Sequence, residues 1–335
     1  IDSDSISKAS VEYSKNKTQE NLEKIIHSSE PGWVELFRRL NTVSDGTLKL
    51  VKLRERVRLL EKDNPKLAFF DAALLNLFKH WFNPSFLVLK RIDWSTPASI
   101  LEKIIAYEAV HEINSWSDLR SRLEPEDRRC FAFFHPLIPN EPLIFVEVAL
   151  TNNMPQKIDQ VIKIDRNVIP ENDINTAVFY SISSCQDGLS GISFGNFLIK
   201  EVVHKLKRKN DGLEKFATLS PVPGFAKWLK EKSINENMDD EDLLKNAIIY
   251  FLHSNREDGF PNDPVARFHL GNGARLERIN LNADMSLKGI HQSKGIMVNY
   301  QYDLDLLENN HELFFQTKEV QYSERIKNLS KKLEI

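Results

Sequence analysis

The sequence predicts an α+β protein, in which a helical N-terminal half is followed by a mixed sheet with flanking helices. From residue 1 to about 125, apolar residues recur at spacings of three and four, the period of an amphipathic helix. After about residue 127 the chain changes to short runs rich in Val, Ile, Phe and Tyr, which are typical of strands. A chain of 335 residues also exceeds what one core usually takes. We therefore expect two domains, residues 1–125 and 126–335.

The composition excludes several classes of protein. The formal net charge is −3, whereas a nucleic-acid-binding chain usually carries a basic excess. Two cysteines, Cys130 and Cys185, are too few for a disulfide framework and suit a reducing compartment. No apolar run approaches the roughly 18 residues that span a bilayer, and the first ten residues lack the pattern of a secretory signal. We expect neither nucleic acid nor membrane as a partner.

Periodicity and caps define the helices of the N-terminal half. Thr96 is expected to cap a helix with Pro97 at its first position, and Ser115 and Asp118 have capping-box spacing. Residues 46–60 place four apolar side chains on one helix face: Leu50, Leu53, Val57 and Leu60. Residues 65–82 are apolar on more than one face, as a helix buried within a bundle would be. The helices of residues 1–125 carry more apolar surface than a small bundle needs, which predicts subunit contacts through residues such as Phe69, Phe70, Leu75, Leu77 and Trp81.

Six short runs in the C-terminal half are expected strands: residues 130–137, 142–150, 174–183, 216–220, 265–270 and 295–304. Between the third and fourth runs, residues 193–210 carry an apolar stripe at helical spacing. A strand, a glycine-containing turn, a helix and a strand in this order predict a crossover unit. Residues 233–263 are expected to form a polar loop and one helix inserted into this domain.

The expected turn before that helix contains Gly188, Gly191 and Gly195. Glycines let the backbone approach a ligand closely, and a helix N-terminus presents free N–H groups to an anion. A phosphate or pyrophosphate site is one interpretation. Because the spacing matches neither a P-loop nor a dinucleotide fingerprint, a purely structural turn is the other.

The stretch "TLSPVPGF" places Ser220 at the end of an expected strand, where open α/β sheets carry ligand-contacting groups. Pro221 disfavours helical geometry at Ser220, and Pro223 stiffens the chain that follows. A hydroxyl fixed in this way can donate to a carboxylate, or act as a nucleophile when a base lies near. The structural alternative is an ordinary Ser-Pro turn.

His269, in "DPVARFHLGNGARL", is the first candidate for a group that gives or takes a proton near neutral pH. His135 and His291 are rivals, and a buried structural histidine is the alternative reading. Neither rival has two further ligands at zinc-like spacing, so no metal site is expected.

Four long stretches resemble the malonyl-CoA decarboxylase family: residues 81–123, 179–203, 219–229 and 263–302. The resemblance covers roughly residues 30 to 303. It implies a helical bundle used in subunit contacts, followed by an acetyltransferase-like (GNAT-type) domain that grips coenzyme A. It further implies decarboxylation of malonyl-CoA to acetyl-CoA and CO2, a reaction of fatty acid metabolism, by a homo-oligomer (dimer or tetramer) with no metal or organic cofactor.

The resemblance also implies which residues act. The family's catalytic Ser, in "LSP-x-PGF", matches Ser220; its catalytic His, in "FHL-x-NGA", matches His269; and a Tyr in "NY-x-Y" matches Tyr302. The family's ligand-binding turn falls on Gly188, Ser190, Gly191, Ile192, Ser193, Phe194, Gly195 and Asn196. His269 is then expected to protonate an enolate and Ser220 to orient the malonyl group, while a nucleophilic Ser220 stays open.

The chain departs from the family pattern in several places. Ser193 stands where animal members often carry an acidic residue, and the segment between Trp228 and Asp263 is short. Gln186 of the acetyltransferase pyrophosphate loop is present, but Leu189 occupies a glycine position. Mitochondrial and peroxisomal members exist, yet no targeting signal is visible and the chain ends in "LEI" rather than "SKL", so we expect a cytoplasmic location if the protein is bacterial.

Two other classes of function stay open. An acyl-CoA-dependent N-acyltransferase would share the expected fold, and an assay with an amine acceptor and acetyl-CoA separates it. A non-catalytic protein that binds coenzyme A is the second, although a binding module has no need of Ser220, His269 and Tyr302 together.

Overall fold

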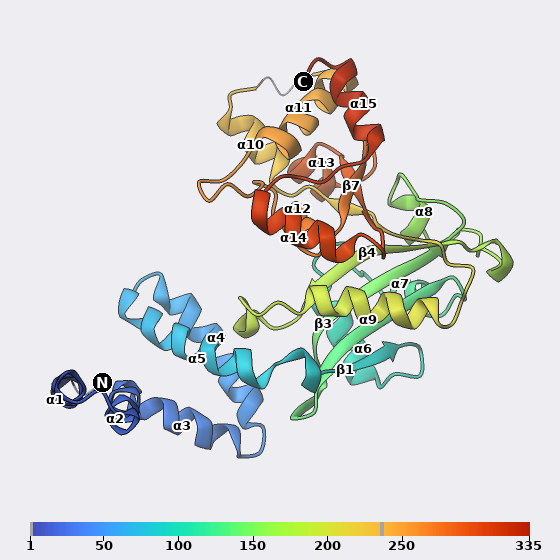
Figure 1. The fold of residues 1–335 in the computed structure, drawn as a ribbon. Coiled ribbons are helices and arrows are strands. Elements are labelled where there is room, and N and C mark those ends of the chain that lie inside the picture. The colour runs from blue at the N-terminus through green and yellow to red at the C-terminus, as the bar shows by residue number, and fades with distance from the viewer. Residues whose placement is uncertain (1–2, 235–237) are drawn as a thin grey trace. The chain divides into compact units, whose positions relative to one another are not determined.

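The structure, a computed structural model, describes residues 3–234 and 238–335 (Figure 1). The described chain divides into two compact units. The smaller unit contains residues 3–87, 135–139 and 186–192. The larger unit contains residues 88–134, 140–185, 193–234 and 238–335. The chain thus first changes unit after residue 87 rather than near residue 125, because residues 88–125 supply a strand and two helices that pack on the sheet.

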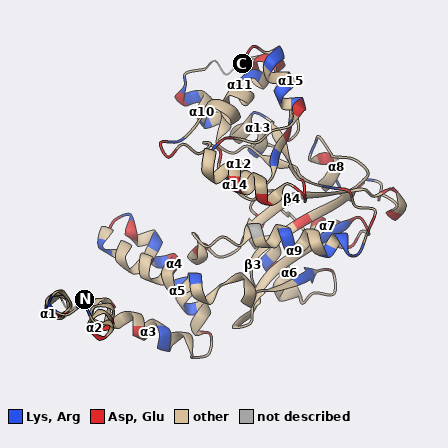
Figure 2. Cartoon of the chain, in the orientation of Figure 1, with Lys and Arg blue, Asp and Glu red and all other residues tan. Residues whose placement is uncertain are grey.

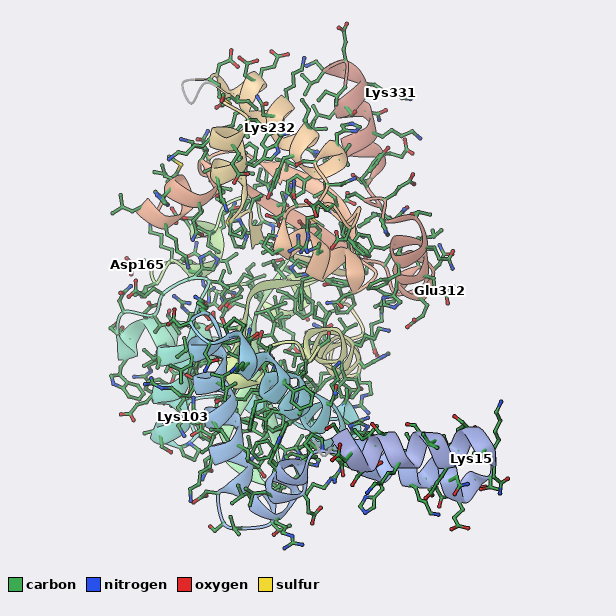
Figure 3. The ribbon with its side chains drawn as sticks, turned by 90° about the vertical axis from the view of Figure 1, so that its left-hand side faces the viewer. Lys15, Lys103, Asp165, Lys232, Glu312 and Lys331 are labelled. Atoms are coloured by element: carbon green, nitrogen blue, oxygen red, sulfur yellow. The ribbon has the colours of Figure 1, made fainter. Side chains whose placement is uncertain are left out.

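The smaller unit is helical, as predicted. Its helices are α1 (Ser3–Lys15), α2 (Gln19–Ser29), α3 (Gly32–Asn41), α4 (Gly46–Glu61) and α5 (Ala68–Trp81), with short 3-10 turns at Pro65–Leu67, Pro84–Phe86 and Asp187–Leu189. α1 and α2 lie side by side as a hairpin, with Lys15 at the end of α1 (Figure 3). Leu74 and Phe78 of α5 are fully buried in this unit.

Helix α4 forms where the spacing predicts it, but its buried face differs from the predicted one. Leu50 and Val57 are buried, whereas Leu53 is 41% and Leu60 46% exposed. The buried position between Leu50 and Val57 is taken by Arg54. A charged side chain is tolerated there because its guanidinium pairs with Asp71 and donates to two backbone carbonyl oxygens, as described below.

The larger unit is built on an eight-stranded mixed sheet. Its strands are β1 (Val88–Ile92), β2 (Arg128–His135), β3 (Ile138–Thr151), β4 (Thr176–Ser184), β5 (Lys215–Thr218), β6 (Ser220–Pro221), β7 (Arg275–Asn280) and β8 (Met297–Tyr302). The order is β1-β2-β3-β4-β5-β8-β6, with β7 also paired to β8. β4 and β5 run parallel and are joined through helix α9 (Gly195–Lys207), which confirms the predicted crossover unit.

Helices cover both faces of the sheet. On one face, α6 (Ala98–Tyr107) and α7 (Trp116–Leu123) pack against alternate residues of β2, including Ala132 and Phe134. On the other face, Phe197 of α9 stacks on Phe133 with ring centroids 5.4 Å apart. The last turn of α9 is basic, which suits the negative end of the helix dipole (Figure 2). Strand β2 is therefore buried on both sides.

The remaining helices follow the central strands. They are α8 (Asp159–Ile162), α10 (Phe225–Glu231), α11 (Asp240–His253), α12 (Pro264–Gly271), α13 (Leu287–Ser293), α14 (Leu307–Thr317) and α15 (Glu324–Lys332), with a 3-10 turn at Glu171–Asp173. α11 confirms the helix predicted within residues 233–263, of which residues 235–237 lie outside the description. Within the described ranges, no helix combines the length and apolarity needed to cross a bilayer.

Two local predictions were wrong. Residues 265–270, predicted as a strand, belong to helix α12, because Pro264 stands at its first turn and the Asp263 side chain accepts the free N–H groups of Val265 and Ala266. Thr96 does not cap α6. Its hydroxyl accepts the N–H of Asp93 instead, and Pro97 takes the cap position. The cap by Ser115 on the N–H of Asp118 is confirmed.

Candidate active site

Ser220 lies in a two-residue strand that pairs with β8, opposite Val298. The side chain is 5% exposed, and its hydroxyl donates a hydrogen bond of 2.8 Å to Oγ1 of Thr218. Thr218 in turn accepts the backbone N–H of Tyr300 at 3.1 Å. Pro221 keeps the backbone of Ser220 extended, and the hydrogen bond to Thr218 orients its hydroxyl when no substrate is bound.

His269 lies on the buried face of α12 and is 4% exposed. Its Nε2 is 3.1 Å from Oγ of Ser220, and its Nδ1 is 2.7 Å from the hydroxyl oxygen of Tyr302. The imidazole stacks on the ring of Tyr300, with centroids 4.7 Å apart. The structure therefore brings Ser220, His269 and Tyr302 into one hydrogen-bonded chain, with Thr218 at its end.

The direction of these hydrogen bonds follows from the network. Because Ser220 donates to Thr218, its oxygen is free to accept the N–H at Nε2 of His269. Nδ1 is then the acceptor for the Tyr302 hydroxyl. Burial lowers the pKa of His269 from 6.5 to about 3, and burial raises the pKa of Tyr302 well above 10. We assign a neutral imidazole with its proton on Nε2, and a neutral phenol.

A pocket of about 230 Å³ opens beside the hydrogen-bonded residues Ser220 and His269. Ser220 and His269 form part of its wall. The other lining residues are Val110, Ile144, Phe179, Tyr180, Ser181, Ile182, Ser184, Pro221, Pro264, Val265 and Phe268. No Lys, Arg, Asp or Glu is among these described lining residues. The pocket is thus apolar with a few hydroxyl groups and one imidazole.

The expected ligand-binding turn divides between the two units. Gly188, Ser190, Gly191 and Ile192 belong to the smaller unit. There Arg54, which is 2% exposed, donates from Nη1 to the carbonyl oxygens of Gly188 and Ser190, each at 2.8 Å, and pairs with Asp71 at 2.9 Å. Gly188 needs to be glycine, since a Cβ would lie 2.0 Å from the carbonyl oxygen of Val51.

Gly191 has a φ of +88°, a conformation that side chains other than glycine rarely adopt. Ser193, Phe194, Gly195 and Asn196 belong to the larger unit, where Phe194 is buried and Gly195 opens α9. A Cβ on Gly195 would lie 2.2 Å from the ring of Phe268, a residue of the pocket wall. The side chain of Asn196 lies outside the description.

The rival histidines have other surroundings. His135 hydrogen-bonds the carbonyl of Trp81 in the smaller unit, at 3.0 Å, and His291 is exposed on α13. Neither is hydrogen-bonded to Ser220 or Tyr302. Across the described residues, no group of three or more His, Cys, Asp or Glu is arranged to hold a metal ion.

Sequence reasoning missed Thr218 and Tyr300, which hold the hydroxyl and the imidazole in place. The alternation of a strand offered a signal for Thr218, because residues two apart point to one side. The same alternation relates Tyr300 to Tyr302, so their rings project from the same strand beside His269.

The fold and the site define an α+β protein whose mixed sheet carries a buried chain of hydroxyl, imidazole and phenol at the wall of an apolar pocket. Two family models match the sequence: the malonyl-CoA decarboxylase N-terminal domain over residues 1–82, and the malonyl-CoA decarboxylase C-terminal domain over residues 85–246 and 235–334. The chain therefore belongs to the malonyl-CoA decarboxylase family and is an enzyme of that family.

Individual relatives agree. The mitochondrial malonyl-CoA decarboxylase of Anser anser anser is 35% identical, and the alignment covers 88% of this chain and 69% of the relative. That of Mus musculus is 34% identical, with 89% and 71% covered. The crystal structure of malonyl-CoA decarboxylase from Agrobacterium vitis is 46% identical with a TM-score of 0.92, covering 98% of this chain and 87% of that one. The enzyme structure from Rhodopseudomonas palustris has a TM-score of 0.90, also at 46% identity, with 98% and 86% covered.

Proposed function

We infer that the chain converts malonyl-CoA to acetyl-CoA and CO2, and that Ser220, His269 and Tyr302 carry the reaction. Membership of the family supports the substrate. The assignment of these three residues rests on their hydrogen bonds, which run from Ser220 through His269 to Tyr302 at the wall of the apolar pocket.

The pocket suits the loss of a carboxylate. A malonyl carboxylate that enters it leaves water for a wall without a Lys or Arg side chain among the described lining residues. Charge is costly in such surroundings, whereas neutral CO2 is not. The transition state spreads the charge from the carboxylate toward the thioester enolate, so it is less penalised than the starting carboxylate. Hydroxyl donors beside the developing enolate oxygen add to this difference.

His269 supplies the proton. When the C–C bond breaks, its electron pair remains as the enolate and CO2 departs. Nε2 then gives its proton to the enolate carbon while the Tyr302 hydroxyl gives its proton to Nδ1, so the imidazole stays neutral and the negative charge of the enolate passes to Tyr302 as a transient phenolate. After the products leave, solvent water returns a proton to Nε2, and Nδ1 returns its proton to Tyr302. One solvent proton is consumed in each turnover, and Tyr302 ends as it began.

Ser220 orients the substrate. Its hydroxyl is free to turn from Thr218 toward a malonyl or thioester oxygen, which aligns the breaking bond with the carbonyl π system. A nucleophilic role needs a base at Nε2. The partner of Nδ1 is a phenol that donates to it, rather than a carboxylate that would make the ring more basic. This arrangement favours orientation over covalent catalysis.

We further propose that the turn at residues 188–196 contacts coenzyme A. Its glycines allow close approach of the backbone, and the first turn of α9 presents N–H groups to a phosphate. The reaction as written needs neither a metal ion nor an organic cofactor. A homo-oligomer held together through the helical unit is the expected assembly.

The test is release of CO2 from carboxyl-labelled malonyl-CoA by the purified full chain in the presence of EDTA. We expect CO2 and acetyl-CoA in equal amounts, and the same activity in His291→Asn, a control on an exposed histidine. No CO2 from a folded protein overturns the function. Activity that disappears on chelation and returns with a divalent ion contradicts the metal-free reaction.

A further inference from the structure

Asp263 makes more contacts than a helix cap requires. Its Oδ1 accepts the N–H groups of Val265 and Ala266, at 2.9 and 2.8 Å, which caps the helix that carries His269. Its carboxylate also accepts the backbone N–H of Gly224, and Oδ2 lies 3.4 Å from the hydroxyl of Tyr250. One side chain thus joins three segments of the larger unit.

Two of these segments carry the proposed catalytic pair. Gly224 ends the run "SPVPG" that begins at Ser220, and its two prolines restrict the backbone between them. Because this run is stiff, a contact that holds Gly224 in place also restricts the position of Ser220. On the other side, the capped first turn of α12 fixes the start of a helix that places His269 one and a half turns later.

The third segment comes from α11, within the insertion whose purpose the sequence leaves open. Tyr250 is 1% exposed and packs on Phe225 and Trp228, with ring centroids 5.5 and 5.2 Å away. Its hydroxyl closely approaches Gly224, where a Cβ would lie 2.4 Å from that oxygen. Any larger residue at position 224 would force Tyr250 away from this position.

A comparison within the chain shows that capping alone does not need this burial. Asp239 caps α11 by accepting the N–H of Asp242 at 2.8 Å, and it is exposed. Asp263 is 1% exposed, and burial raises the pKa of its carboxyl from 3.8 to about 6. Burying a carboxylate is costly, so the additional contacts to Gly224 and Tyr250 set Asp263 apart from an ordinary cap.

We propose that Asp263 is a positioning residue that, supported by Tyr250, sets the distance between Oγ of Ser220 and Nε2 of His269. The inserted segment of residues 240–263 thereby holds the proposed catalytic pair in place through Asp263 and Tyr250. This role rests on the proposed function, because the pair must react for its spacing to matter. The contacts that define the role are present without substrate.

The experiment compares Asp263→Asn, Tyr250→Phe and the control Asp239→Asn in the full chain. Asn at position 263 has one acceptor oxygen, whereas the carboxylate has two to share between the N–H groups of α12 and of Gly224. We expect kcat to fall about 10- to 100-fold in Asp263→Asn with KM within about twofold, because a misplaced reacting group slows chemistry more than binding. Tyr250→Phe should lose a few-fold, and Asp239→Asn should match the parent.

A second measurement does not depend on turnover. In the free protein, the 15N NMR signals of the His269 ring report which nitrogen carries the proton. We expect these signals to shift in Asp263→Asn and in Tyr250→Phe, and to stay in place in Asp239→Asn. If Asp263→Asn fails to fold, the His269 ring signals of Tyr250→Phe test the proposal: a shift supports it, and parental signals contradict it.

Parental kcat and parental ring signals in Asp263→Asn would overturn the proposal, as would an equal loss in the Asp239→Asn control. Failure of the proposed function is distinguishable. In that case the parent releases no CO2 from malonyl-CoA, while the NMR comparison still tests whether Asp263 positions His269.

Discussion

At the scale of single residues, the partners of a group decide what it can do. His269 is buried between a serine hydroxyl, a tyrosine hydroxyl and the face of a tyrosine ring, and it also forms part of the pocket wall. The sequence predicted a histidine titrating near neutral pH, whereas burial lowers its pKa to about 3. In the mechanism that we propose, the proton that His269 transfers therefore belongs to the neutral ring, and Tyr302, whose hydroxyl faces Nδ1, replaces it.

The division of labour between Ser220 and His269 is testable. We expect His269→Asn to lower kcat by about 10² to 10⁴ with little change in KM, the range for loss of a positioned acid. Ser220→Ala should lose less, because it removes orientation alone. Mass spectrometry of enzyme quenched during turnover provides the check. A malonyl or acetyl adduct on the peptide that contains Ser220 would contradict the orienting role and establish a nucleophile.

Tyr302→Phe tests the proposed proton transfer from the Tyr302 hydroxyl to Nδ1 of His269. The variant keeps the ring but removes the hydroxyl that faces Nδ1. We expect kcat to fall by about 10²-fold, since the imidazole can no longer stay neutral while Nε2 gives up its proton. Tyr322→Phe, which alters an exposed tyrosine, is the control. Equal rates for Tyr302→Phe and the parent would exclude Tyr302 from the proton transfer.

The buried imidazole also predicts a dependence of stability on pH. The folded pKa of about 3 lies below the unfolded value of 6.5, so the unfolded state binds more protons between these values. The contribution of His269 to the free energy of unfolding is therefore fully present above pH 6.5. It is lost on acidification toward pH 3, at up to about 1.4 kcal/mol per pH unit.

Urea unfolding of the parent and of His269→Asn at pH 7, 6 and 5 measures this contribution. The difference in free energy of unfolding between parent and variant should shrink as the pH falls. A difference that stays constant over this range would mean that His269 is not held neutral in the folded state.

At the scale of elements, the sequence correctly predicted the helices and strands that are determined by residues close together in the chain. The crossover from β4 through α9 to β5 and the capping of α7 depend on neighbouring residues, and both are confirmed. The apolar run at residues 265–270 was misread because a short run fits both a strand and a helix, and the cap by Asp263 decided for the helix. Arg54 was missed because its partners lie 17 to 136 residues away.

Gly191 permits a prediction about the turn. Its φ of +88° is unfavourable for valine, so Gly191→Val should distort the backbone that we propose to contact coenzyme A. We expect a strong rise in KM for malonyl-CoA with a smaller change in kcat. Gly32→Val is the control, since a Cβ there meets no atom within 4 Å. If Gly191→Val folds and binds coenzyme A like the parent, the turn is structural only.

At the scale of the whole molecule, the boundary between the units was the hardest feature to predict. Residues 88–125 look helical in sequence except for five residues of β1, yet they pack on the sheet of the larger unit. Similarly, residues 135–139 and 186–192 join the smaller unit although they lie far along the chain. Periodicity reports the type of an element but does not report the partner against which it packs.

The smaller unit predicts an oligomer. Ile26, Leu36 and Phe69 are 61%, 52% and 51% exposed, and exposed apolar residues in such number favour a protein partner. We expect sedimentation at micromolar concentration to show a dimer or tetramer. Leu36→Asp combined with Phe69→Asp should shift the protein toward the monomer, whereas Leu287→Asp, at an apolar residue exposed in the larger unit, should not. A monomeric parent contradicts this prediction.

The absence of a cation among the described residues of the pocket wall has a consequence for metabolism. If this pocket holds the malonyl group, as we propose, the wall that disfavours the carboxylate of malonyl-CoA does not disfavour acetyl-CoA, which has lost that charge. The product should consequently compete well for the site, with an inhibition constant no higher than the dissociation constant of malonyl-CoA. Flux through the enzyme would then follow the ratio of the two thioesters, and the reaction would slow as its own product accumulates.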